Sequence, residues 1–282
     1  MTSALDALSE PQRRLVNAWL PGAEVARDHS WGLVGTTVLE VVHAGERYVV
    51  KAADEHDHHL ARELRAHREW LAPWVAVARG PELVHADGEA KVIVTRLVPG
   101  VLVEGSAAEH DPDVYRQAGE LLALLHGQES HVDPEFEARA KAKSLAWLDK
   151  PHRITPDVEE RLRAEIASWP SPPALVVPTH GDWQPRNWLV DDGVVSAIDL
   201  GRADLRPAVS DLARLAAQQF RGAPELEVAF LEGYGGDPRE PEAWHRLCVS
   251  EAVGTAVWAF QVGEESFEQQ GHRMIADALA NR

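Results

Sequence analysis

Three oxygen-bearing side chains at short intervals are the part of this sequence best suited to chemistry. Asp182 follows His180-Gly181 after an apolar run, and Asn187 comes five residues later. Another apolar run ends in Asp199-Leu200-Gly201. A metal-dependent phosphoryl transferase needs such a set, because one carboxylate must face the attacking hydroxyl while an amide and a second carboxylate hold Mg²⁺ against the nucleotide phosphates. The spacing therefore indicates phosphoryl transfer.

Each of these residues has an expected role. Asp182 is the predicted catalytic residue, since its carboxylate can accept the hydroxyl proton and orient the oxygen for in-line attack. Asn187 and Asp199 are the predicted metal ligands, because Mg²⁺ takes few protein oxygens and completes its shell with phosphate and water. We expect His180 to hold the loop by packing and hydrogen bonding, and Gly201 to let the backbone turn sharply. The alternative for Asp182 is a residue of a surface turn.

The N-terminal part of the chain supplies a candidate nucleotide site. Residues 36–42 and 47–52 are rich in apolar and β-branched side chains, and the Gly-containing turn between them predicts a hairpin. Lys51 closes the second strand, where it can reach the α- and β-phosphates. A helix expected at residues 58–71 follows, and its Glu63 is the predicted ion-pair partner of Lys51.

Three other assignments remain open at this stage. Glu69 competes with Glu63 for the ion pair with Lys51, and a solvated glutamate is the alternative for both. The segment 29–35 has the glycines and the hydroxyl expected of a phosphate-covering loop, although two glycines three residues apart are a weak signal. Asp211 precedes apolar positions at helical spacing, so we expect either a buried acceptor that braces the catalytic loop or a solvated helix residue.

These residues together resemble the aminoglycoside phosphotransferase and choline kinase family. The resemblance is carried by His180-Gly181-Asp182 with Asn187, Ile198-Asp199-Leu200-Gly201, Asp211-Leu212-Ala213, Lys51 and Arg62-Glu63. It implies an α+β, bilobal protein-kinase-like fold, with a small N-terminal antiparallel-sheet lobe and a larger, mainly helical C-terminal lobe. We expect these lobes at residues 1–97 and 98–282.

The same resemblance implies ATP or GTP as phosphate donor and Mg²⁺ as cofactor. It also implies that the nucleotide base is held by the backbone of an interlobe hinge, expected within residues 94–100 and including Thr95, Arg96, Leu97 and Val98. The chain departs from many relatives after the His-Gly-Asp motif, where it has Trp183-Gln184-Pro185-Arg186. Arg186 adds a positive charge beside the metal site, suited to a phosphate or an anionic substrate.

Helical periodicity and breakers predict most of the remaining elements. Helices are expected at residues 2–20, 112–125, 141–148, 156–167, 243–263 and 265–280. The aromatic side chains Trp244, Trp258 and Phe260 are expected in the core rather than on a ligand platform. The histidines and aspartates of residues 54–59 are expected to form a solvated turn before a helix rather than a metal cluster.

Composition and charge limit the classes of partner that we expect the protein to bind. The chain has 282 residues, one cysteine (Cys248) and a formal net charge of −17. We expect no nucleic-acid partner, because phosphate repulsion would oppose binding. Apolar runs are too short to span a membrane and no signal peptide is evident, so we expect no membrane association, and the single cysteine suits a cytoplasmic location. An acidic surface raises the local concentration of a cationic acceptor, and the alternative is an acidic protein whose charge has no such purpose. Acidic residues concentrate near the expected acceptor side: Asp237, Glu240, Glu242, Glu251, Glu264, Glu265 and Glu268.

The leading hypothesis is a Mg²⁺-dependent kinase that moves the γ-phosphate of ATP or GTP to a hydroxyl of a small molecule, such as an aminoglycoside-like or other cationic antibiotic. The first alternative is a metabolic kinase of a sugar, amino sugar or amino alcohol. The second is a non-catalytic nucleotide-binding regulator, which the complete set of catalytic residues disfavours. A protein kinase is disfavoured because the interval from Asp199 to Asp211 leaves no room for a long activation segment.

Overall fold

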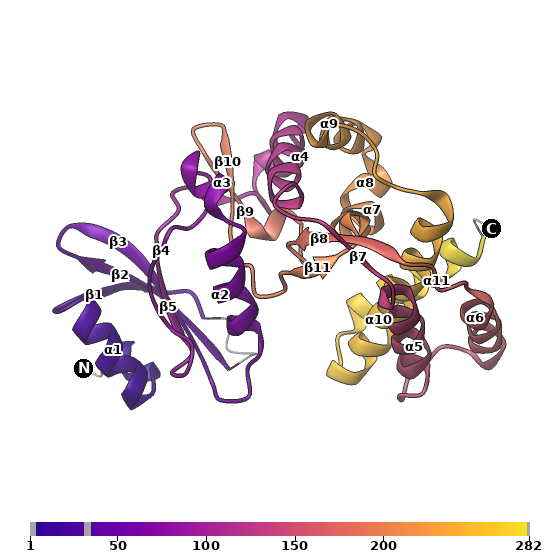
Figure 1. Ribbon diagram of the computed structural model, residues 1–282, viewed down its shortest axis with the longest axis horizontal. Coiled ribbons are helices and arrows are strands. Elements are labelled where there is room, and N and C mark those ends of the chain that lie inside the picture. The colour runs from indigo at the N-terminus through magenta and orange to yellow at the C-terminus, as the bar shows by residue number, and fades with distance from the viewer. Residues whose placement is uncertain (1–3, 31–34, 281–282) are drawn as a thin grey trace. The chain divides into compact units, whose positions relative to one another are not determined.

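The computed structural model describes residues 4–30 and 35–280 (Figure 1). The α-helices are α1 (Glu10–Trp19), α2 (His59–Glu69), α3 (Ala72–Ala76), α4 (Pro112–His126), α5 (Phe136–Leu148), α6 (Pro156–Ser168), α7 (Ala213–Ala217), α8 (Gln219–Gly222), α9 (Pro224–Tyr234), α10 (Pro241–Val262) and α11 (Glu265–Ala280). The strands are β1 (Glu24–Asp28), β2 (Thr36–His43), β3 (Glu46–Ala53), β4 (Leu83–Asp87), β5 (Val92–Arg96), β6 (Val101–Leu102), β7 (His131–Asp133), β8 (Ala174–Thr179), β9 (Trp188–Asp191), β10 (Val194–Ala197) and β11 (Asp204–Arg206). Four 3₁₀ helices complete this part of the chain: η1 (Ala4–Ala7), η2 (Ala107–His110), η3 (Pro185–Asn187) and η4 (Ala208–Asp211).

An antiparallel sheet of five strands, in the order β1-β2-β3-β5-β4, forms the N-terminal part. The predicted hairpin is present as β2 and β3, which are joined by a two-residue turn at Ala44 and Gly45 with positive φ angles at both positions. Alternate residues of the strands, including Leu39, Val41 and Val50, pack against η1 and α1. Helix α2 covers the opposite face, where its Leu60 and Leu64 pack against Ile93 of β5 (Figure 1).

The predicted helix at residues 2–20 is wrong as a single element. Within the described residues it is divided into η1 and α1, and Ser9 begins α1 through a capping box with Gln12. Pro11 explains the division, because proline has no backbone N–H to donate and its ring clashes with the preceding turn of a continuing helix.

The α+β, bilobal protein-kinase-like fold is confirmed, and the chain divides into two compact units, each composed of three segments. The first unit contains residues 1–128, 180–204 and 225–235, and the second contains residues 129–179, 205–224 and 236–282. The lobe boundary expected between residues 97 and 98 stays a prediction, since it concerns lobes rather than these units. The first unit joins the five-stranded sheet to the segment that carries Asp182, Asn187 and Asp199.

Helix α4 is the central helix of the first unit. The predicted apolar stripe is confirmed, since Val114, Ala118, Leu121, Leu122 and Leu125 are all buried. Helix α4 packs against α9, a helix that periodicity did not predict, and the two approach closely at glycines on both sides. A small sheet in the order β10-β9-β6 belongs to the same unit, and its strand β9 directly follows Asn187.

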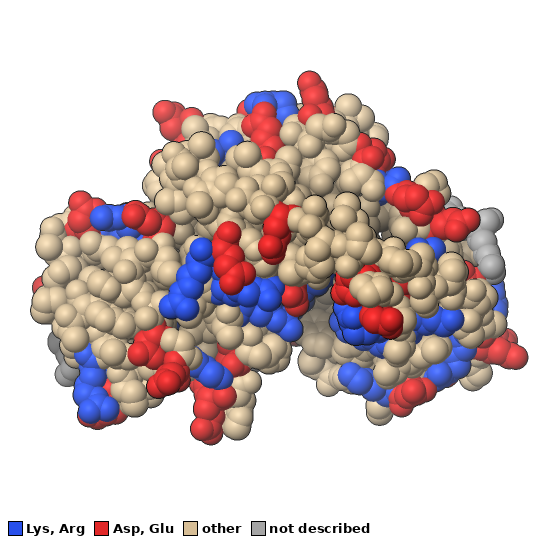
Figure 2. Space-filling view, viewed as in Figure 1, with Lys and Arg blue, Asp and Glu red and all other residues tan. Residues whose placement is uncertain are grey.

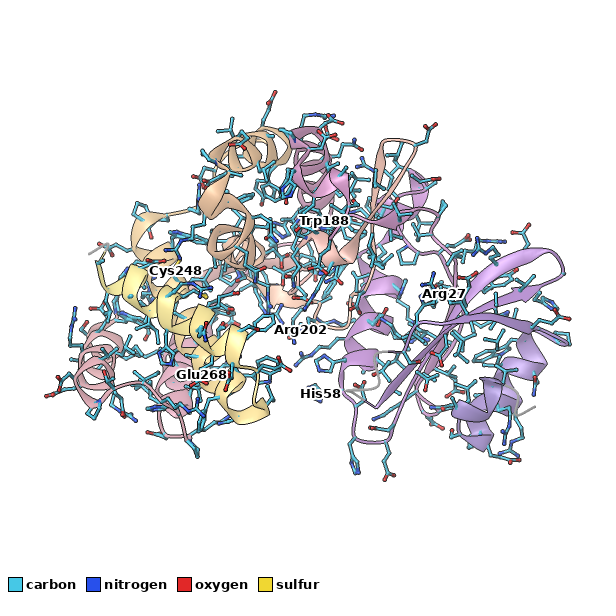
Figure 3. All side chains as sticks on the ribbon, turned by 180° about the vertical axis from the view of Figure 1, so that it is seen from behind. Arg27, His58, Trp188, Arg202, Cys248 and Glu268 are labelled. Atoms are coloured by element: carbon cyan, nitrogen blue, oxygen red, sulfur yellow. The ribbon has the colours of Figure 1, made fainter. Side chains whose placement is uncertain are left out.

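The second unit has its own core, built mainly from α5, α6, α10 and α11. The predicted helices at residues 141–148, 156–167, 243–263 and 265–280 are present, and α5 begins earlier, at Phe136. The core assignment of three aromatic residues is wrong for Trp258, which is 43% exposed and contacts Phe267 edge-on. Trp244 and Phe260 are half-buried. Burial raises the pKa of the Cys248 thiol on α10 to about 11 (Figure 3).

Surface charges of both signs are interspersed over the face that Figure 2 shows. Across residues 4–30 and 35–280, no helix is both long and apolar enough to cross a membrane. The same residues contain no group of three or more His, Cys, Asp or Glu side chains able to hold a metal ion. In the histidine-rich turn before α2, His56 contacts Glu55 and His58 stacks on His59.

Candidate active site

Strand register places Lys51 on the face of the sheet that α2 covers. Lys51 is paired across strands with Ile93, and Ile93 packs against α2. The Lys51 ammonium therefore points toward α2, where it donates to both carboxylate oxygens of Glu63 at 2.9 and 2.8 Å. Glu63 is the partner and the competing assignment is wrong, because Glu69 instead lies 3.9 Å from Arg65.

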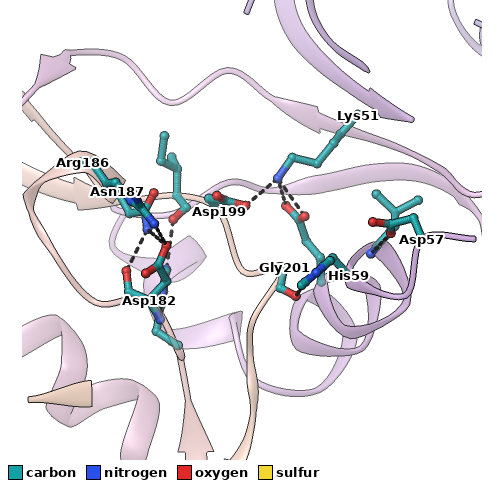
Figure 4. Close-up of polar contacts among 12 residues, drawn as sticks. Lys51, Asp57, His59, Asp182, Arg186, Asn187, Asp199 and Gly201 are labelled. Atoms are coloured by element: carbon teal, nitrogen blue, oxygen red, sulfur yellow. Dashed lines mark hydrogen bonds and ion pairs between the residues drawn. The ribbon is translucent and has the colours of Figure 1, made fainter. Parts of the chain in front are cut away.

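Lys51 also donates to Asp199 Oδ1 at 2.8 Å, so one ammonium bridges two carboxylates (Figure 4). The charge of Lys51 holds the pKa of Asp199 well below its usual range, although burial opposes the shift. Burial alone would lower the pKa of Lys51, but Glu63 and Asp199 together raise it. Burial raises the pKa of Glu63 against the attraction of Lys51. The side chain of Asp199 remains 50% exposed.

The sharp turn beside Asp199 has a different cause from the one expected. Asp199 itself has a positive φ of 65°, while Gly201 is not among the residues with positive φ. A Cβ at Gly201 would lie 3.4 Å from the His59 Cβ and 3.8 Å from Glu63 Oε2, which are ordinary van der Waals distances, so neither the backbone angle nor close packing against α2 requires glycine at this position. The Gly201 carbonyl is also 2.9 Å from His59 Nδ1.

His180 holds the Asp182 loop as expected. Its side chain is fully buried, and Nδ1 lies 3.3 Å from the Asp182 backbone nitrogen. Because Nδ1 accepts from that N–H, Nε2 carries the proton and donates to the Ile198 carbonyl at 3.0 Å. The Ile198 N–H in turn donates to the Asn187 carbonyl at 3.0 Å. These bonds join the Asp182 loop to the strand end that carries Asp199.

Asp182 is buried and accepts hydrogen bonds at both carboxylate oxygens. Gln184 Nε2 donates to Oδ1 at 2.6 Å. Arg186 Nη2 and Asn187 Nδ2 both donate to Oδ2, at 2.6 and 3.1 Å (Figure 4). Asn187 Nδ2 donates in addition to the Asp182 carbonyl at 2.7 Å. The surface-turn alternative for Asp182 is therefore wrong.

A cluster of aromatic rings packs under this loop. Trp183 contacts Trp74, His180 and Trp188 with ring-centre distances of 5.7, 5.2 and 5.4 Å. Tyr115 of α4 meets Trp188 edge-on at 5.4 Å, and Trp188 lies in the interior of the unit (Figure 3). Since all three tryptophans are fully buried, the loop is supported by close packing as well as by hydrogen bonds.

The expected hinge residues lie at and just after the end of β5. Thr95 is buried, whereas the Arg96 side chain is exposed and forms an ion pair with Glu82 at 2.9 Å. The backbone N–H of Leu97 donates to the Arg47 carbonyl at 3.1 Å. Val98 is half-buried and begins the segment before Pro99-Gly100. Their contact with a nucleotide stays a prediction.

The expectations for Asp211 and for the loop at residues 29–35 have different outcomes. Asp211 is only 2% exposed, so the solvated alternative is wrong, while its bracing role stays a prediction. The phosphate-covering loop expected at residues 29–35 falls largely on residues 31–34, which lie outside the described residues.

Sequence reasoning missed two residues of the site. Gln184 was noted only as a departure from the pattern of relatives, yet it bonds directly to Asp182. His59 was assigned to a solvated turn, yet it contacts the Gly201 carbonyl and links α2 to the Asp-Leu-Gly segment. Periodicity along α2 could not identify His59, because its partner is far away in the sequence.

The residues present fit a magnesium ion. Because Asn187 directs its NH₂ group at two oxygens of Asp182, its Oδ1 faces away and has no hydrogen-bond partner within the described chain. The half-exposed Asp199 supplies an ionised carboxylate. One carboxylate and one amide oxygen match a metal that relies on phosphate and water for its other ligands.

The fold and this constellation define a phosphotransferase of the protein-kinase-like class. The family model described as the phosphotransferase enzyme family (APH) matches residues 29–247. The chain belongs to this family, which confirms the resemblance stated from its motifs, and the protein is a small-molecule phosphotransferase. A comparison with the curated proteins gives no significant match.

Several solved structures share the fold. Macrolide 2′-phosphotransferase MphH from Brachybacterium faecium is 17% identical, with a TM-score of 0.59 over 93% of this chain and 95% of that chain. Choline kinase LicA from Streptococcus pneumoniae is 14% identical, with a TM-score of 0.65 over 96% and 98%. A thermostable mutant of aminoglycoside phosphotransferase APH(4)-Ia, in ternary complex with ADP and hygromycin B, is 12% identical, with a TM-score of 0.65 over 96% and 98%. At these identities the similarity establishes the fold alone.

Proposed function

We propose that the protein transfers the γ-phosphate of ATP or GTP to a hydroxyl of a small molecule, with Asp182 as the general base. The observation that carries the proposal is the occurrence of Asp182, Asn187, Asp199 and the Lys51–Glu63 pair in one compact unit. A non-catalytic regulator would not need all of these groups.

Lys51, Glu63 and the hinge form the nucleotide side of the proposal. Glu63 fixes the Lys51 ammonium, which binds the α- and β-phosphates, and the backbone of residues 95–98 holds the base. The Val98 N–H has no backbone partner within the described chain and is available to a base edge. ADP in the complex of the aminoglycoside phosphotransferase APH(4)-Ia supports a nucleotide donor.

Asn187 and Asp199 are the proposed ligands of Mg²⁺. When bound, Mg²⁺ neutralises the charge on the transferring phosphate. Asp199 is kept ionised by Lys51, so it is ready to bind a cation at neutral pH. Asn187 contributes an uncharged oxygen and at the same time fixes the Asp182 carboxylate.

Asp182 carries the proton in the proposed reaction. Its carboxylate takes the proton of the acceptor hydroxyl as the hydroxyl oxygen forms its bond to the γ-phosphorus. The bond from the γ-phosphorus to the bridging oxygen breaks, and its electron pair leaves with the nucleoside diphosphate. The buried aromatic cluster and the His180 hydrogen bonds keep the carboxylate in position.

Replacing Asp182 tests this role. We expect Asp182→Asn to lower kcat by about 10²- to 10⁴-fold, the usual contribution of a general base. Asp192→Asn is the matched control, because Asp192 lies exposed in the β9–β10 turn with a positive φ that asparagine tolerates. Turnover by Asp182→Asn equal to that of the control, at saturating nucleotide and Mg²⁺, would falsify the assignment.

The charge of −17 supports the proposal of a cationic acceptor, because an acidic protein attracts cations. Three of the seven C-terminal acidic residues, however, already have intramolecular partners. Asp237 forms an ion pair with Arg239, Glu240 accepts from the first N–H groups of α10, and Glu268 is buried beside Arg153. The remaining four are the better candidates for ammonium groups: Glu242, Glu251, Glu264 and Glu265.

An acceptor panel separates the antibiotic kinase from a metabolic kinase of a sugar, amino sugar or amino alcohol. Nucleotide consumption is measured with aminoglycosides, macrolides, peptide antibiotics, amino sugars and choline. A polycationic acceptor should lose rate steeply as salt is raised, whereas a neutral sugar should not. The similarity to a choline kinase fold keeps the amino alcohol in the panel. A cytoplasmic location belongs to the same proposal.

A further inference from the structure

The candidate base is engaged by its own loop. Asp182 has a 6% exposed side chain, and both of its carboxylate oxygens accept hydrogen bonds, Oδ1 from Gln184 and Oδ2 from Arg186 and Asn187. An acceptor hydroxyl must donate to the same carboxylate before its proton can be transferred. These donors take three of the roughly four acceptor positions of a carboxylate that is almost fully buried, so the acceptor hydroxyl has to compete with them.

Arg186 is the donor best able to leave. Gln184 and Asn187 are buried, and the Asn187 N–H donates to the Gln184 carbonyl at 2.9 Å, which ties the residue before η3 to its last residue. The Arg186 side chain is 25% exposed and has a long, flexible stem. Its guanidinium is also the only positive charge among the three. Because charge-assisted hydrogen bonds are the strong ones, the guanidinium exchanges the carboxylate only for an anion that binds it more strongly.

The terminal phosphate of a bound nucleotide is such an anion. Arg186 and Asn187 donate to the same oxygen, Asp182 Oδ2, so the guanidinium lies beside the proposed metal ligand. A phosphate held beside that ligand would therefore lie near the guanidinium. The γ-phosphate has more negative charge than a carboxylate and matches the planar guanidinium with two parallel hydrogen bonds. Lys51 is already shared by Glu63 and Asp199.

We propose that Arg186 is a γ-phosphate sensor, which leaves Asp182 for the terminal phosphate when a nucleoside triphosphate binds and so frees the base for the acceptor hydroxyl. The inference rests on the proposed function of the same site. It makes the base available with a triphosphate but not with a diphosphate.

Nucleotide binding without acceptor tests the inference. Titration calorimetry with Mg²⁺ compares the nonhydrolysable triphosphate AMP-PNP with ADP on the full chain. We expect Arg186→Gln to weaken AMP-PNP binding by about tenfold or more, as for loss of a hydrogen bond between charged groups, and to leave the Kd of ADP within about twofold. Arg186→Lys should retain part of the preference. Arg139→Gln, which removes an exposed ion pair with Asp133, is the control.

A second variant should change the affinity for AMP-PNP in the opposite direction. If Asp182 and the γ-phosphate compete for Arg186, Asp182→Asn should tighten AMP-PNP binding relative to ADP. That gain should disappear when Arg186→Gln is added, which separates competition from a general loss of negative charge. Equal weakening of both nucleotides by Arg186→Gln, or an unchanged AMP-PNP affinity, overturns the inference.

These outcomes are distinct from failure of the proposed function. If the wild-type protein binds neither these adenine nucleotides nor their guanine counterparts, the proposed function itself fails. If it binds both the triphosphate and the diphosphate and Asp182→Asn abolishes turnover while Arg186→Gln keeps the full preference for the triphosphate, only the sensor is wrong.

Discussion

Lys51 compensates the charge of two carboxylates, and the two differ in burial. The side chain of Glu63 is 6% exposed, whereas that of Asp199 is half open to solvent. Loss of Lys51 therefore leaves mainly Glu63 as an uncompensated buried charge. We expect Lys51→Met to lower the free energy of unfolding by about 3 kcal/mol, in the range for one broken buried pair, as measured by urea denaturation at neutral pH.

The matched control adds Glu63→Gln to Lys51→Met. The double variant removes the buried charge, so it should be more stable than Lys51→Met alone and recover a large part of the loss. If Lys51→Met is as stable as the wild type, or if the second change lowers stability further, Glu63 does not depend on Lys51 for its charge balance.

His67 on α2 links the stability of the protein to pH. Burial lowers the pKa of His67 to about 4, the Lys51 charge acts in the same direction, and the Pro81 backbone weakly opposes the shift. In the unfolded chain histidine titrates near 6.5, so the unfolded state binds a proton first as the pH falls. Stability is lost from about pH 6.5 down to about pH 4, and we expect this residue to account for about 1.5 kcal/mol between pH 6.5 and pH 5.

Denaturation curves at a series of pH values check this expectation. The His67→Gln variant has no such proton to bind, so its free energy of unfolding should depend less on pH by that amount. Parallel pH profiles for the variant and the wild type would show that His67 titrates alike in both states.

Helices α10 and α11 depend on a close approach at one glycine. A Cβ at Gly271 would lie 2.7 Å from the Ala256 Cβ and closer still to the Ala256 backbone. Gly271→Ala must therefore push the two helices apart, and we expect a loss of about 1–3 kcal/mol in thermal unfolding, as for other overpacked cores. Gly222→Ala on α8 is the control, because no atom lies within 4 Å and alanine favours a helix. Equal Tm values for the two variants would contradict this reason for Gly271.

Elements with strong periodicity were predictable from the sequence, and short ones were not. Helices α4, α10 and α11 lie close to their predicted bounds, since each has an apolar face or clear breakers at its ends. Helix α9 was not predicted. Its packing is visible only in the structure, where Gly233 approaches the Arg116 carbonyl of α4. Strand β6 has only two residues, too few for any alternation.

The candidate site was predictable where it depends on local spacing. The interval from Asp182 to Asn187 lies within one loop, so the sequence brings these side chains together almost unaided. The choice of Glu63 over Glu69 depended on which face of α2 meets the sheet, a tertiary property that periodicity only suggests. The ion pair between Arg186 and Asp182 depends on the turn of η3, which brings the Arg186 side chain next to the Asp182 carboxylate.

For the molecule as a whole, the chain order of the first unit constrains its assembly. Residues 1–128 supply the sheet, α2 and α4, but Asp182, Asn187 and Asp199 come only from residues 180–204. The second unit is likewise completed by the last stretch of the chain. Neither unit can therefore be obtained as one uninterrupted fragment, so activity, binding and stability have to be measured on the full chain.

The rings packed around Trp183 have a spectroscopic consequence. Three of the ten tryptophans of the chain lie in ring contact beneath Asp182, two of them with indole N–H groups that have no hydrogen-bond partner in the described chain. Such neighbouring chromophores exchange excitation, so their near-ultraviolet circular dichroism and emission are sensitive to small changes in mutual orientation. The protein thus contains an intrinsic optical reporter of the Asp182 loop, with no label attached.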